Sequence, residues 1–471
     1  MKPTLSLSTN EELEMSRPIF AACFFCIAVM FSGATLDAQD WNQWRGPTGN
    51  GGSVDAQPPT QWSDTENVKW KVAIPGRGSG SPLITGNKVF VVSAVQTEQG
   101  AKDAEAQKQA QAQNQSQGGQ QGRGGGGRRG RKRGPAIPMV EMDFKLFCFD
   151  RSSGEVLWEK TATTATPHQG THSTNGFASA SPCTDGQHVY AFFGSRGLFC
   201  YSVDGDLVWK RDDFGQMNTR NNFGEGSSPT LFEDKLIMPW DHEGPSSIYA
   251  LNKLTGETIW KTDRDEPTNW GTPIVVENGD QKQVVITGQT KVRAYDLESG
   301  EEVWSCGGQT QRPCATAVAI DDLVIVGSGH RGSFMGAFKL DGKGDIAGSD
   351  KIAWSINQNT PDIASPVLSN GRLYFHKGKT GILTCLDAKT GSPLFSATRV
   401  PGISSTYASP IAAGGNIYLT GRSGNTVVIK DSDKFEVVAS NSVGETVDAT
   451  PAPAGDNLFI RGEKHLFCIG G

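Results

Sequence analysis

Two stretches of this 471-residue chain read almost alike: ALNKLTGETIW at residues 250–260 and AYDLESGEEVW at residues 294–304. Each begins with a small residue, has Asp or Asn two positions later, passes a turn with Gly and ends at Trp. Further copies, some of them looser, end at Trp158, Trp209, Trp354, Phe395 and Val438. Short apolar runs on either side of a Gly-containing turn are typical of β-hairpins. The repeat therefore predicts antiparallel strand pairs along the whole chain.

A second motif precedes each copy: a Ser-Pro or Thr-Pro pair that leads into an apolar strand, a turn and another apolar strand. The pairs begin at Ser81, Ser181, Ser228, Thr272, Ser365, Ser409 and Thr450, and Ala315-Thr316-Ala317 takes the remaining position without proline. Both motifs count to eight independently. Units of about 40 to 50 residues with four short strands are the signature of propeller blades. We therefore predict an all-β fold, an eight-bladed β-propeller of four-stranded antiparallel blades.

Two half-copies of the repeat, at Trp70 and at His465–Ile469, lie at opposite ends of the chain. They predict that a strand over Asn67–Val72 pairs with the last strand, so that N-terminal and C-terminal strands complete one blade. Such pairing removes the free edges of an open ring. The propeller then spans residues 67–471, and residues 39–66 form an N-terminal extension.

An apolar run over Ile19–Phe31 is followed by small residues, as in a secretory signal peptide. It is too short to cross a membrane comfortably. Three acidic residues shortly before it indicate that Met15 is the true start. We expect cleavage after Ala38, with Ala34 as the second choice, so that residues 1–38 are removed. The mature protein would be periplasmic or extracellular, without a transmembrane anchor.

The formal net charge of −6 provides no overall attraction to nucleic acid or to an anionic membrane. We expect a monomer that binds an envelope protein or an anionic envelope ligand, and no nucleic acid.

Seven cysteines follow the signal peptide, an odd number that leaves at least one thiol unpaired. Cys148, Cys200, Cys385 and Cys468 take the small-residue position of the repeat, so we predict that they are buried and free. Cys183 has no obvious partner. For Cys306 and Cys314, which flank one loop between blades, both a disulfide and free thiols stay open.

Residues 96–138 interrupt the first blade between its second and third strands. The stretch is rich in Gln and Ala, then in Gly, and contains the basic run Arg128–Arg133. Such a composition cannot bury a core, so we predict a disordered segment. It would leave the blade on the same face as the functional loops, where it could gate that face or bind an acidic polymer.

The small-x-Asp-x-x-Thr-Gly-x-x-x-Trp repeat resembles the tryptophan-docking repeat of the pyrroloquinoline quinone (PQQ) propellers. The resemblance covers essentially the whole mature chain. Trp41–Gly51, Trp240–Gly244 and Asp263–Thr268 are also similar to segments of secreted PQQ-like propellers from environmental bacteria. The family includes quinoprotein dehydrogenases and non-enzymatic propellers such as BamB, and the resemblance implies that the tryptophans join neighbouring blades.

The dehydrogenases of that family carry an adjacent Cys-Cys disulfide over the quinone, a Ca²⁺ site and often a Cys-x-x-Cys-His haem site. This chain has neither a Cys-Cys pair nor Cys-x-x-Cys-His. The resemblance therefore implies a propeller without a cofactor, with PQQ as the alternative.

Functional residues are expected on the loops of one face, from the outer strand to the next inner strand and from the second strand to the third. These loops predict a cationic funnel for an anionic ligand. Its candidate residues are His168, His172, Arg196, Asp241, His242, Glu243, His330, Arg331, Lys377 and Arg422. Short exposed turns favour polar side chains in any case, and this alternative stays open.

Two groups among these candidates have a second interpretation. The spacing of His168 and His172 would suit a metal on a helix, but Pro167 and Gly170 indicate a loop, so we predict polar contacts and no metal. Residues 240–243 could supply a general base or a ligand-stacking ring, but we favour a hydrogen-bonded loop that closes one blade.

These observations favour a non-catalytic, exported binding or scaffold module of the cell envelope. The alternative is a divergent PQQ-dependent oxidoreductase. A third, weaker hypothesis is a lyase or hydrolase that uses the histidines of the funnel. No catalytic residue can be assigned from the sequence.

Overall fold

The computed structural model describes residues 40–117 and 137–471. The predicted signal peptide, the predicted start at Met15 and the basic run of the insertion lie outside these residues. No helix in the described part of the chain is long and apolar enough to cross a membrane.

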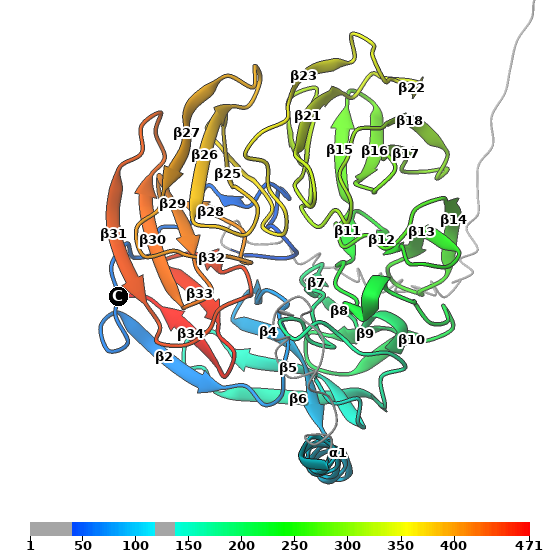
Figure 1. Ribbon diagram of the computed structural model, residues 1–471, viewed down its shortest axis with the longest axis vertical. Helices are drawn as coiled ribbons and strands as arrows, with labels where there is room; N and C mark the ends of the chain where they lie inside the picture. Colours follow the sequence, from blue (N-terminus) through cyan, green and yellow to red (C-terminus); the bar gives the residue numbers. More distant parts are fainter. Residues whose placement is uncertain (1–39, 118–136) are drawn as a thin grey trace, which may run out of the picture. The chain divides into compact units, whose positions relative to one another are not determined.

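Eight antiparallel sheets surround a common centre, which confirms the predicted eight-bladed β-propeller (Figure 1). Within the first seven blades the four antiparallel strands follow the chain from the inner strand outward, whereas the outer strand of the eighth blade is β2. The first four blades contain β3 (Leu83–Thr85), β4 (Lys88–Gln96), β5 (Met142–Asp150) and β6 (Val156–Ala165); β7 (Cys183–Thr184), β8 (His188–Phe192), β9 (Leu198–Ser202) and β10 (Leu207–Arg211); β11 (Thr230–Phe232), β12 (Lys235–Trp240), β13 (Ser246–Asn252) and β14 (Thr258–Arg264); and β15 (Ile274–Asn278), β16 (Gln281–Ile286), β17 (Val292–Asp296) and β18 (Glu302–Cys306).

The other four blades contain β19 (Val318–Ile320), β20 (Leu323–Ser328), β21 (Phe334–Lys339) and β23 (Ile352–Ile356); β24 (Val367–Ser369), β25 (Arg372–His376), β26 (Ile382–Asp387) and β27 (Pro393–Arg399); β28 (Ile411–Ala413), β29 (Asn416–Thr420), β30 (Asn425–Lys430) and β31 (Val437–Ser442); and β32 (Ala452–Ala454), β33 (Asn457–Arg461), β34 (His465–Ile469) and β2 (Val68–Ala73). Two blades gain a fifth, parallel strand: β1 (Gly52–Ser53) pairs with β28, and β22 (Gly344–Asp345) pairs with β18.

The eighth blade joins the two ends of the propeller, as predicted. Strand β2 pairs antiparallel with β34, so that Val68 lies opposite Ile469 and Ala73 lies opposite His465. Buried side chains of this blade share one cluster with Val89 of the first blade. Burial of apolar surface thus stabilises the junction where the ring closes.

Five of the repeated tryptophans bond their blade to the next. The indole N–H groups of Trp70, Trp158, Trp209, Trp260 and Trp354 donate to a backbone carbonyl of the following blade at 2.9–3.2 Å. The acceptor is in each case the residue after the Asp, Asn or Ser of the repeat. Trp304 differs, because it donates to the side chain of Gln283 in its own blade at 3.0 Å.

Residues 40–59, which we call the N-terminal strap, cross the inner strands of the propeller. Their hydrogen-bond partners are, in order, Ile84, Thr184, Leu231, Ala319, Leu368, Ala412 and Gly455. These partners belong to the first three and the last four blades, so the strap follows the blades in their own order. The first six partners each lie three residues after the Ser or Thr of the Ser-Pro motif. The strap therefore lies at one constant level of the ring.

Arg45 anchors the strap in the core. Its buried guanidinium donates to the carbonyl oxygens of Pro366 and Pro410, the latter at 2.8 Å, and to that of Asn50 at 3.3 Å. Burial lowers the pKa of Arg45 to about 9. The side chain is therefore charged at neutral pH, and backbone carbonyls provide its hydrogen-bond acceptors.

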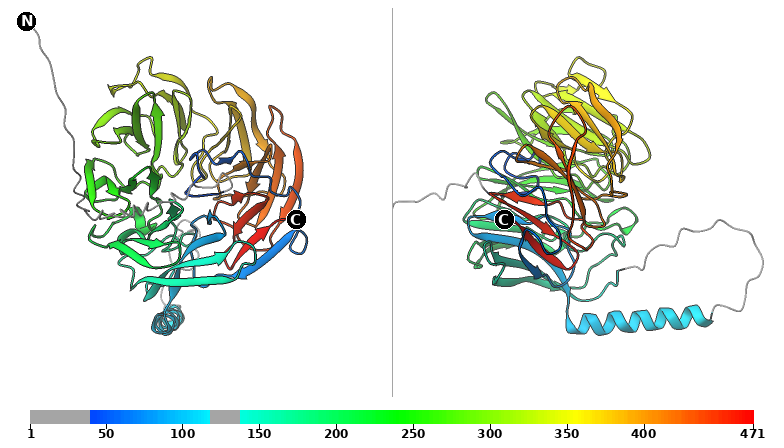
Figure 2. Two further views of the ribbon diagram at one scale, coloured as in Figure 1. Left: turned by 180° about the vertical axis from the view of Figure 1, so that it is seen from behind. Right: turned by 90° about the vertical axis from the view of Figure 1, so that its left-hand side faces the viewer.

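The insertion lies between β4 and β5, as predicted, but its first part differs from the prediction. Residues 98–117, expected to be disordered, form helix α1 (Glu98–Gln117), which projects from the first blade (Figure 2). The Thr97 hydroxyl accepts the N–H of Gly100 at 3.0 Å, as an N-cap does. Ala, Gln, Lys and Glu are strong helix formers. These residues cannot form a core, but a helix of strong helix formers does not need one.

All seven cysteines of the described residues are free thiols. Cys148, Cys200, Cys385 and Cys468 are buried in the blades, as predicted. The disulfide left open between the remaining two candidates does not form.

Candidate functional site

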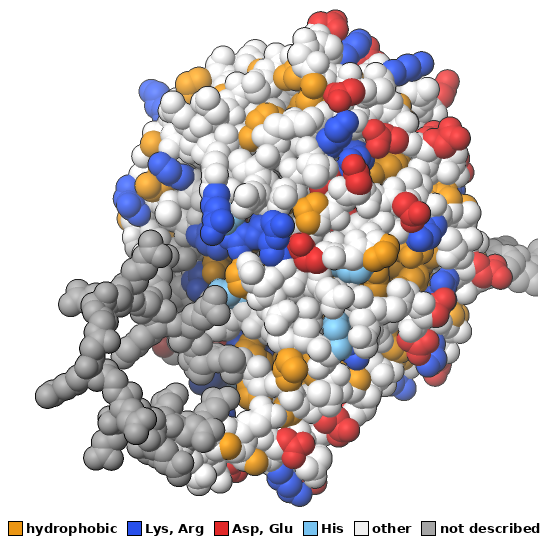
Figure 3. Space-filling model, turned by 45° about the vertical axis from the view of Figure 1, so that its right-hand side comes forward, with side chains coloured by type: hydrophobic (Ala, Val, Ile, Leu, Met, Phe, Trp, Pro, Cys, Tyr) orange, Lys and Arg blue, Asp and Glu red, His pale blue; other side chains and the backbone are white. Residues whose placement is uncertain are grey.

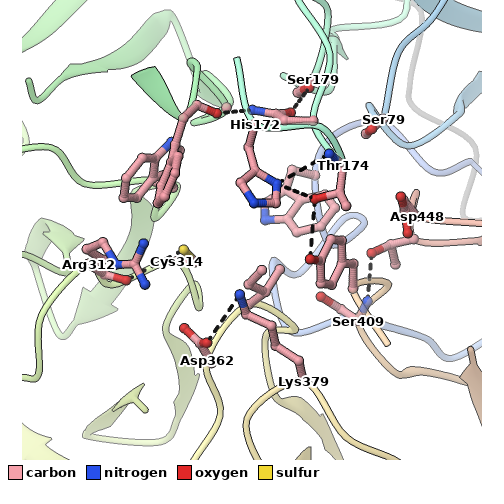
Figure 4. A pocket seen from close by; sticks show the side chains of 18 residues that line it. Ser79, His172, Thr174, Ser179, Arg312, Cys314, Asp362, Lys379, Ser409 and Asp448 are labelled. Atoms are coloured by element: carbon pink, nitrogen blue, oxygen red, sulfur yellow. Dashed lines mark hydrogen bonds and ion pairs between the residues drawn. The ribbon is translucent and has the colours of Figure 1, made fainter. Parts of the chain in front are cut away.

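The loops that enter the inner strands surround a cavity of about 370 Å³, which we call the hub cavity (Figure 4). Each of the eight loops contributes the residue two positions before the Ser or Thr of the Ser-Pro motif. These residues are Ser79, Ser179, Gly226, Trp270, Cys314, Ile363, Tyr407 and Asp448. The strap contributes Trp44, whose indole N–H donates to the Thr316 hydroxyl at 3.1 Å.

A ring of hydrogen bonds holds these loops in place. The backbone N–H of each motif Ser or Thr donates to the hydroxyl of its counterpart in the next blade, at 2.9–3.3 Å. The ring runs through Ser81, Ser181, Ser228, Thr272, Thr316, Ser365, Ser409 and Thr450, all of them buried. Between Thr450 and Ser81 no such bond is found in the described chain, where the Ser81 hydroxyl has no partner.

Arg312 brings a cation to the cavity wall. Its guanidinium lies 5.1 Å from the ring centre of Phe223 and donates to Nδ1 of His330 at 2.6 Å. Burial is the main cause that lowers the pKa of Arg312; the charge of Asp362 opposes it, and those of Arg331 and Arg220 add to it. No carboxylate of the described residues lies within 4.0 Å of this guanidinium. Figure 3 shows Lys and Arg side chains gathered near the middle of one face.

Lys379 is the second cation of the lining. Its Nζ is 3.7 Å from Oδ2 of Asp362 and 5.6 Å from the ring centre of Tyr407. Asp362 is also 4.0 Å from Nδ1 of His330. Burial and the charge of Arg312 lower the pKa of His330, which favours the neutral imidazole that Arg312 requires as an acceptor.

Arg422 joins Tyr407 to the acid Asp448. The guanidinium of Arg422 lies 4.2 Å from the ring centre of Tyr407. It forms two bonds to Asp448, from Nε to Oδ1 at 2.6 Å and from Nη2 to Oδ2 at 2.9 Å. These bonds raise the pKa of Arg422. Such bidentate pairing fixes both side chains beside the cavity.

His172 and Thr174 complete the wall. His172 Nδ1 is 2.8 Å from the Thr174 hydroxyl, which donates in turn to the Tyr407 hydroxyl at 3.3 Å. Cys314 contributes a thiol, whose pKa burial raises to about 12. The thiol is therefore protonated at neutral pH and is a poor nucleophile.

The structure brings three of the ten predicted funnel residues to the hub cavity. His172 lines it, whereas His330 and Arg422 contact lining residues. Arg331 and Lys377 are exposed.

The other five predicted residues lie elsewhere. Arg196 donates to His168 Nδ1 at 2.6 Å, and both line a smaller pocket of about 30 Å³. Asp241 is buried in an ion pair with Arg264 at 2.8 Å. His242 bonds to the Pro245 carbonyl at 3.1 Å, and Glu243 accepts the Thr268 hydroxyl at 2.9 Å. These contacts are those of hydrogen-bonded loops.

Arg312, Asp362 and Tyr407 were not among the predicted residues, and Cys314 was considered only for a disulfide. Most of the predicted residues came from the loops between the second and third strands, whereas the loops into the inner strands form most of the cavity. The position two residues before each Ser or Thr was a usable signal, although the residue there differs in almost every blade.

The fold and the hub cavity together define the class of protein. It is an eight-bladed propeller in which tryptophans join neighbouring blades around a central cavity large enough for a small ligand. The chain belongs to the PQQ-like β-propeller family. The family model described as outer membrane protein assembly factor BamB matches residues 60–221, 143–397 and 244–469.

Three known proteins are similar to this chain. Tetrathionate hydrolase of Acidithiobacillus ferrooxidans is 22% identical in an alignment of 303 residues, which covers 58% of this chain and 53% of that protein. The chain thus spans about half the length of this curated relative. The quinohemoprotein alcohol dehydrogenase of Comamonas testosteroni has a TM-score of 0.56 at 10% identity, over 92% of this chain and 81% of its own. A europium-containing methanol dehydrogenase has a TM-score of 0.56 at 10% identity, over 90% and 89%. At this identity the two structures share the fold alone.

The residues of the hub do not fit a metal-assisted quinone site. Across residues 40–117 and 137–471, no three His, Cys, Asp or Glu side chains are grouped to hold a metal ion. The acids of the lining, Asp362 and Asp448, already face Lys379 and Arg422. This set of donors differs from the one that the resemblance implies for the dehydrogenases.

Proposed function

We propose that this protein is a non-catalytic binding module of the cell envelope that holds a small anionic ligand in the hub cavity. One observation carries the proposal: the half-buried Arg312 guanidinium lines the cavity with no carboxylate of the described chain within 4.0 Å. A cation that is partly removed from water attracts an anion more strongly than an exposed one. Cavities of this size, with aromatic walls and a few polar groups, are typical of small-molecule sites.

The state of the reactive groups supports binding in preference to catalysis. The Cys314 thiol is protonated at neutral pH because burial raises its pKa to about 12. Asp448 is engaged by both donors of Arg422, and Asp362 faces Lys379 and His330. These acids therefore balance the charge of neighbouring cations.

We further propose that the protein acts as an exported monomer, in the periplasm or outside the cell. The apolar run near the N-terminus and the family description as an outer membrane protein assembly factor support this. An envelope protein bound elsewhere on the propeller is compatible with a ligand in the hub.

The test is isothermal titration calorimetry of residues 39–471 with citrate, sulfate, acetate and tetrathionate. Tetrathionate is included because the name of the curated relative refers to it. We expect at least one of these anions to bind, and Arg312→Gln to weaken it about tenfold or more. Arg399→Gln, which changes an exposed arginine on β27, is the matched control and should leave affinity unchanged. Equal affinities of the two variants would refute the proposed site.

A divergent quinoprotein oxidoreductase is the second candidate, because two quinoprotein structures share the fold. If it is correct, purified protein with added PQQ and Ca²⁺ will show the absorbance of bound quinone and will reduce a dye acceptor. Our proposal expects neither signal.

A further inference from the structure

The polar groups of the hub cavity are divided between two sides. With eight blades, the junction between blades 4 and 5 lies directly across the ring from the junction between blades 8 and 1. Arg312 belongs to the first junction and Ser79 to the second. Lys379, from the loop between β25 and β26, likewise faces the side that carries Thr174 and Ser179 (Figure 4). Arg312 and Lys379 therefore lie across the cavity from the hydroxyl groups of Ser79, Thr174 and Ser179.

The hydroxyl groups of the ring add donors to the lining. The Ser409 hydroxyl oxygen accepts the N–H of Ser365, and the Thr450 oxygen accepts the N–H of Ser409, both at 2.9 Å. A hydroxyl that accepts a bond keeps its hydrogen for donation. Both residues line the cavity, so their hydrogens are available to oxygen atoms of a ligand.

The charges of the lining favour a ligand with a single negative charge. Arg312 and Lys379 are opposed by Asp362 and Asp448, and Arg422 neutralises the second of these acids. The set thus has one more cation than acids. A second carboxylate on the ligand would approach Asp362 or Asp448 and be repelled.

Aromatic side chains also line the hub cavity. They belong to Phe223, Trp270 and Tyr407. Flat aromatic faces pack against the C–H face of a sugar ring, while the rim of such a ring carries hydroxyl groups.

We infer that the ligand of the hub cavity is a hexuronic acid, either free or at the end of an acidic polysaccharide. This inference rests on the proposed function and names its ligand class. The carboxylate lies against Arg312 and Lys379, the ring packs on the aromatic wall, and the hydroxyl groups bond to Ser79, Ser409 and Thr450.

The experiment compares galacturonate, galactose and acetate in calorimetric titrations of residues 39–471. Galactose has the hydroxyl groups without the charge, and acetate has the charge without the sugar. We expect galacturonate to bind at least about tenfold more tightly than either of them. Arg312→Gln should reduce galacturonate to the affinity of galactose. Ser79→Ala should weaken galacturonate several-fold and leave the affinity for acetate unchanged.

Each outcome separates this inference from the proposed function. If acetate or sulfate binds as tightly as galacturonate and Ser79→Ala has no effect, the sugar assignment fails while the anion site stands. If galactose binds equally well, the sugar acid is likewise excluded. If no anion binds, both fail. Trigalacturonate that binds more tightly than galacturonate identifies a polysaccharide end as the source, and equal affinity identifies the free acid.

Discussion

The indole of Trp260 covers Gly300 of the next blade so closely that a β-carbon on Gly300 would lie 2.5 Å from Cδ2 of the tryptophan. The Trp260 N–H donates to the Leu297 carbonyl in the same turn at 2.9 Å. Gly154, Gly205, Gly256 and Gly391 meet the tryptophan of their preceding blade in the same way. The glycine of the repeat is thus required by a neighbouring blade as well as by its own turn.

Gly300→Ala should therefore destabilise the protein by about 2 to 4 kcal/mol, because it combines left-handed strain with a clash at the blade interface. Gly279→Ala is the matched control, since its φ of +61° resembles the +72° of Gly300 but nothing lies within 4 Å of its added carbon. The control should cost only about 1 kcal/mol. Urea unfolding of both variants measures the difference, and equal losses would contradict the clash.

His376 should make stability depend on pH. Burial lowers the pKa of this fully buried imidazole from 6.5 to about 4. The unfolded chain binds the proton as the pH falls through 6.5, whereas the folded chain does so only near 4, so stability is lost between these values. The loss amounts to about 3 kcal/mol. In His376→Leu the free energy of unfolding, measured in urea at pH 7, 5 and 4, should fall by correspondingly less. Parallel losses in both proteins would rule out this histidine as the source.

Arg45→Met should destabilise the closed ring. The substitution leaves the buried carbonyls of Pro366 and Pro410 without their donor. Unsatisfied buried groups cost about 1 to 3 kcal/mol each, so we expect a loss of about 2 kcal/mol or more. Arg399→Met changes an exposed arginine and serves as the control. A melting temperature equal to that of the control would show that the strap does not depend on Arg45.

The cysteine thiols should be unreactive until the protein unfolds. Six of the seven described cysteines are buried, and burial raises the pKa of Cys314 in the cavity wall to about 12. Native protein at pH 8 should react with a disulfide reagent at less than one thiol per chain, and in guanidinium at all seven. A shortfall of two in guanidinium would reveal a disulfide that the structure lacks.

The fold was accessible from the sequence because the constraints on Trp260 and Gly256 recur in most blades and the one on Thr272 recurs in all eight. The hub cavity was not, because the residue two positions before each motif Ser or Thr has no fixed chemistry: it is Trp270 in one blade and Asp448 in another. These positions can be recognised only by their distance from the Ser or Thr of the Ser-Pro motif. Helix α1 was missed for a different reason, since local propensity forms a helix without a core to bury.

The N-terminal strap is synthesised before all of the blades that it contacts. Its residues leave the ribosome before any blade does, yet their partners run from Ile84 in the first blade to Gly455 at the end of β32 in the last. The strap can acquire its full set of bonds only after the chain that follows it has been assembled. The strap is thus made first, but it can be fully bonded only when almost the whole chain has been made.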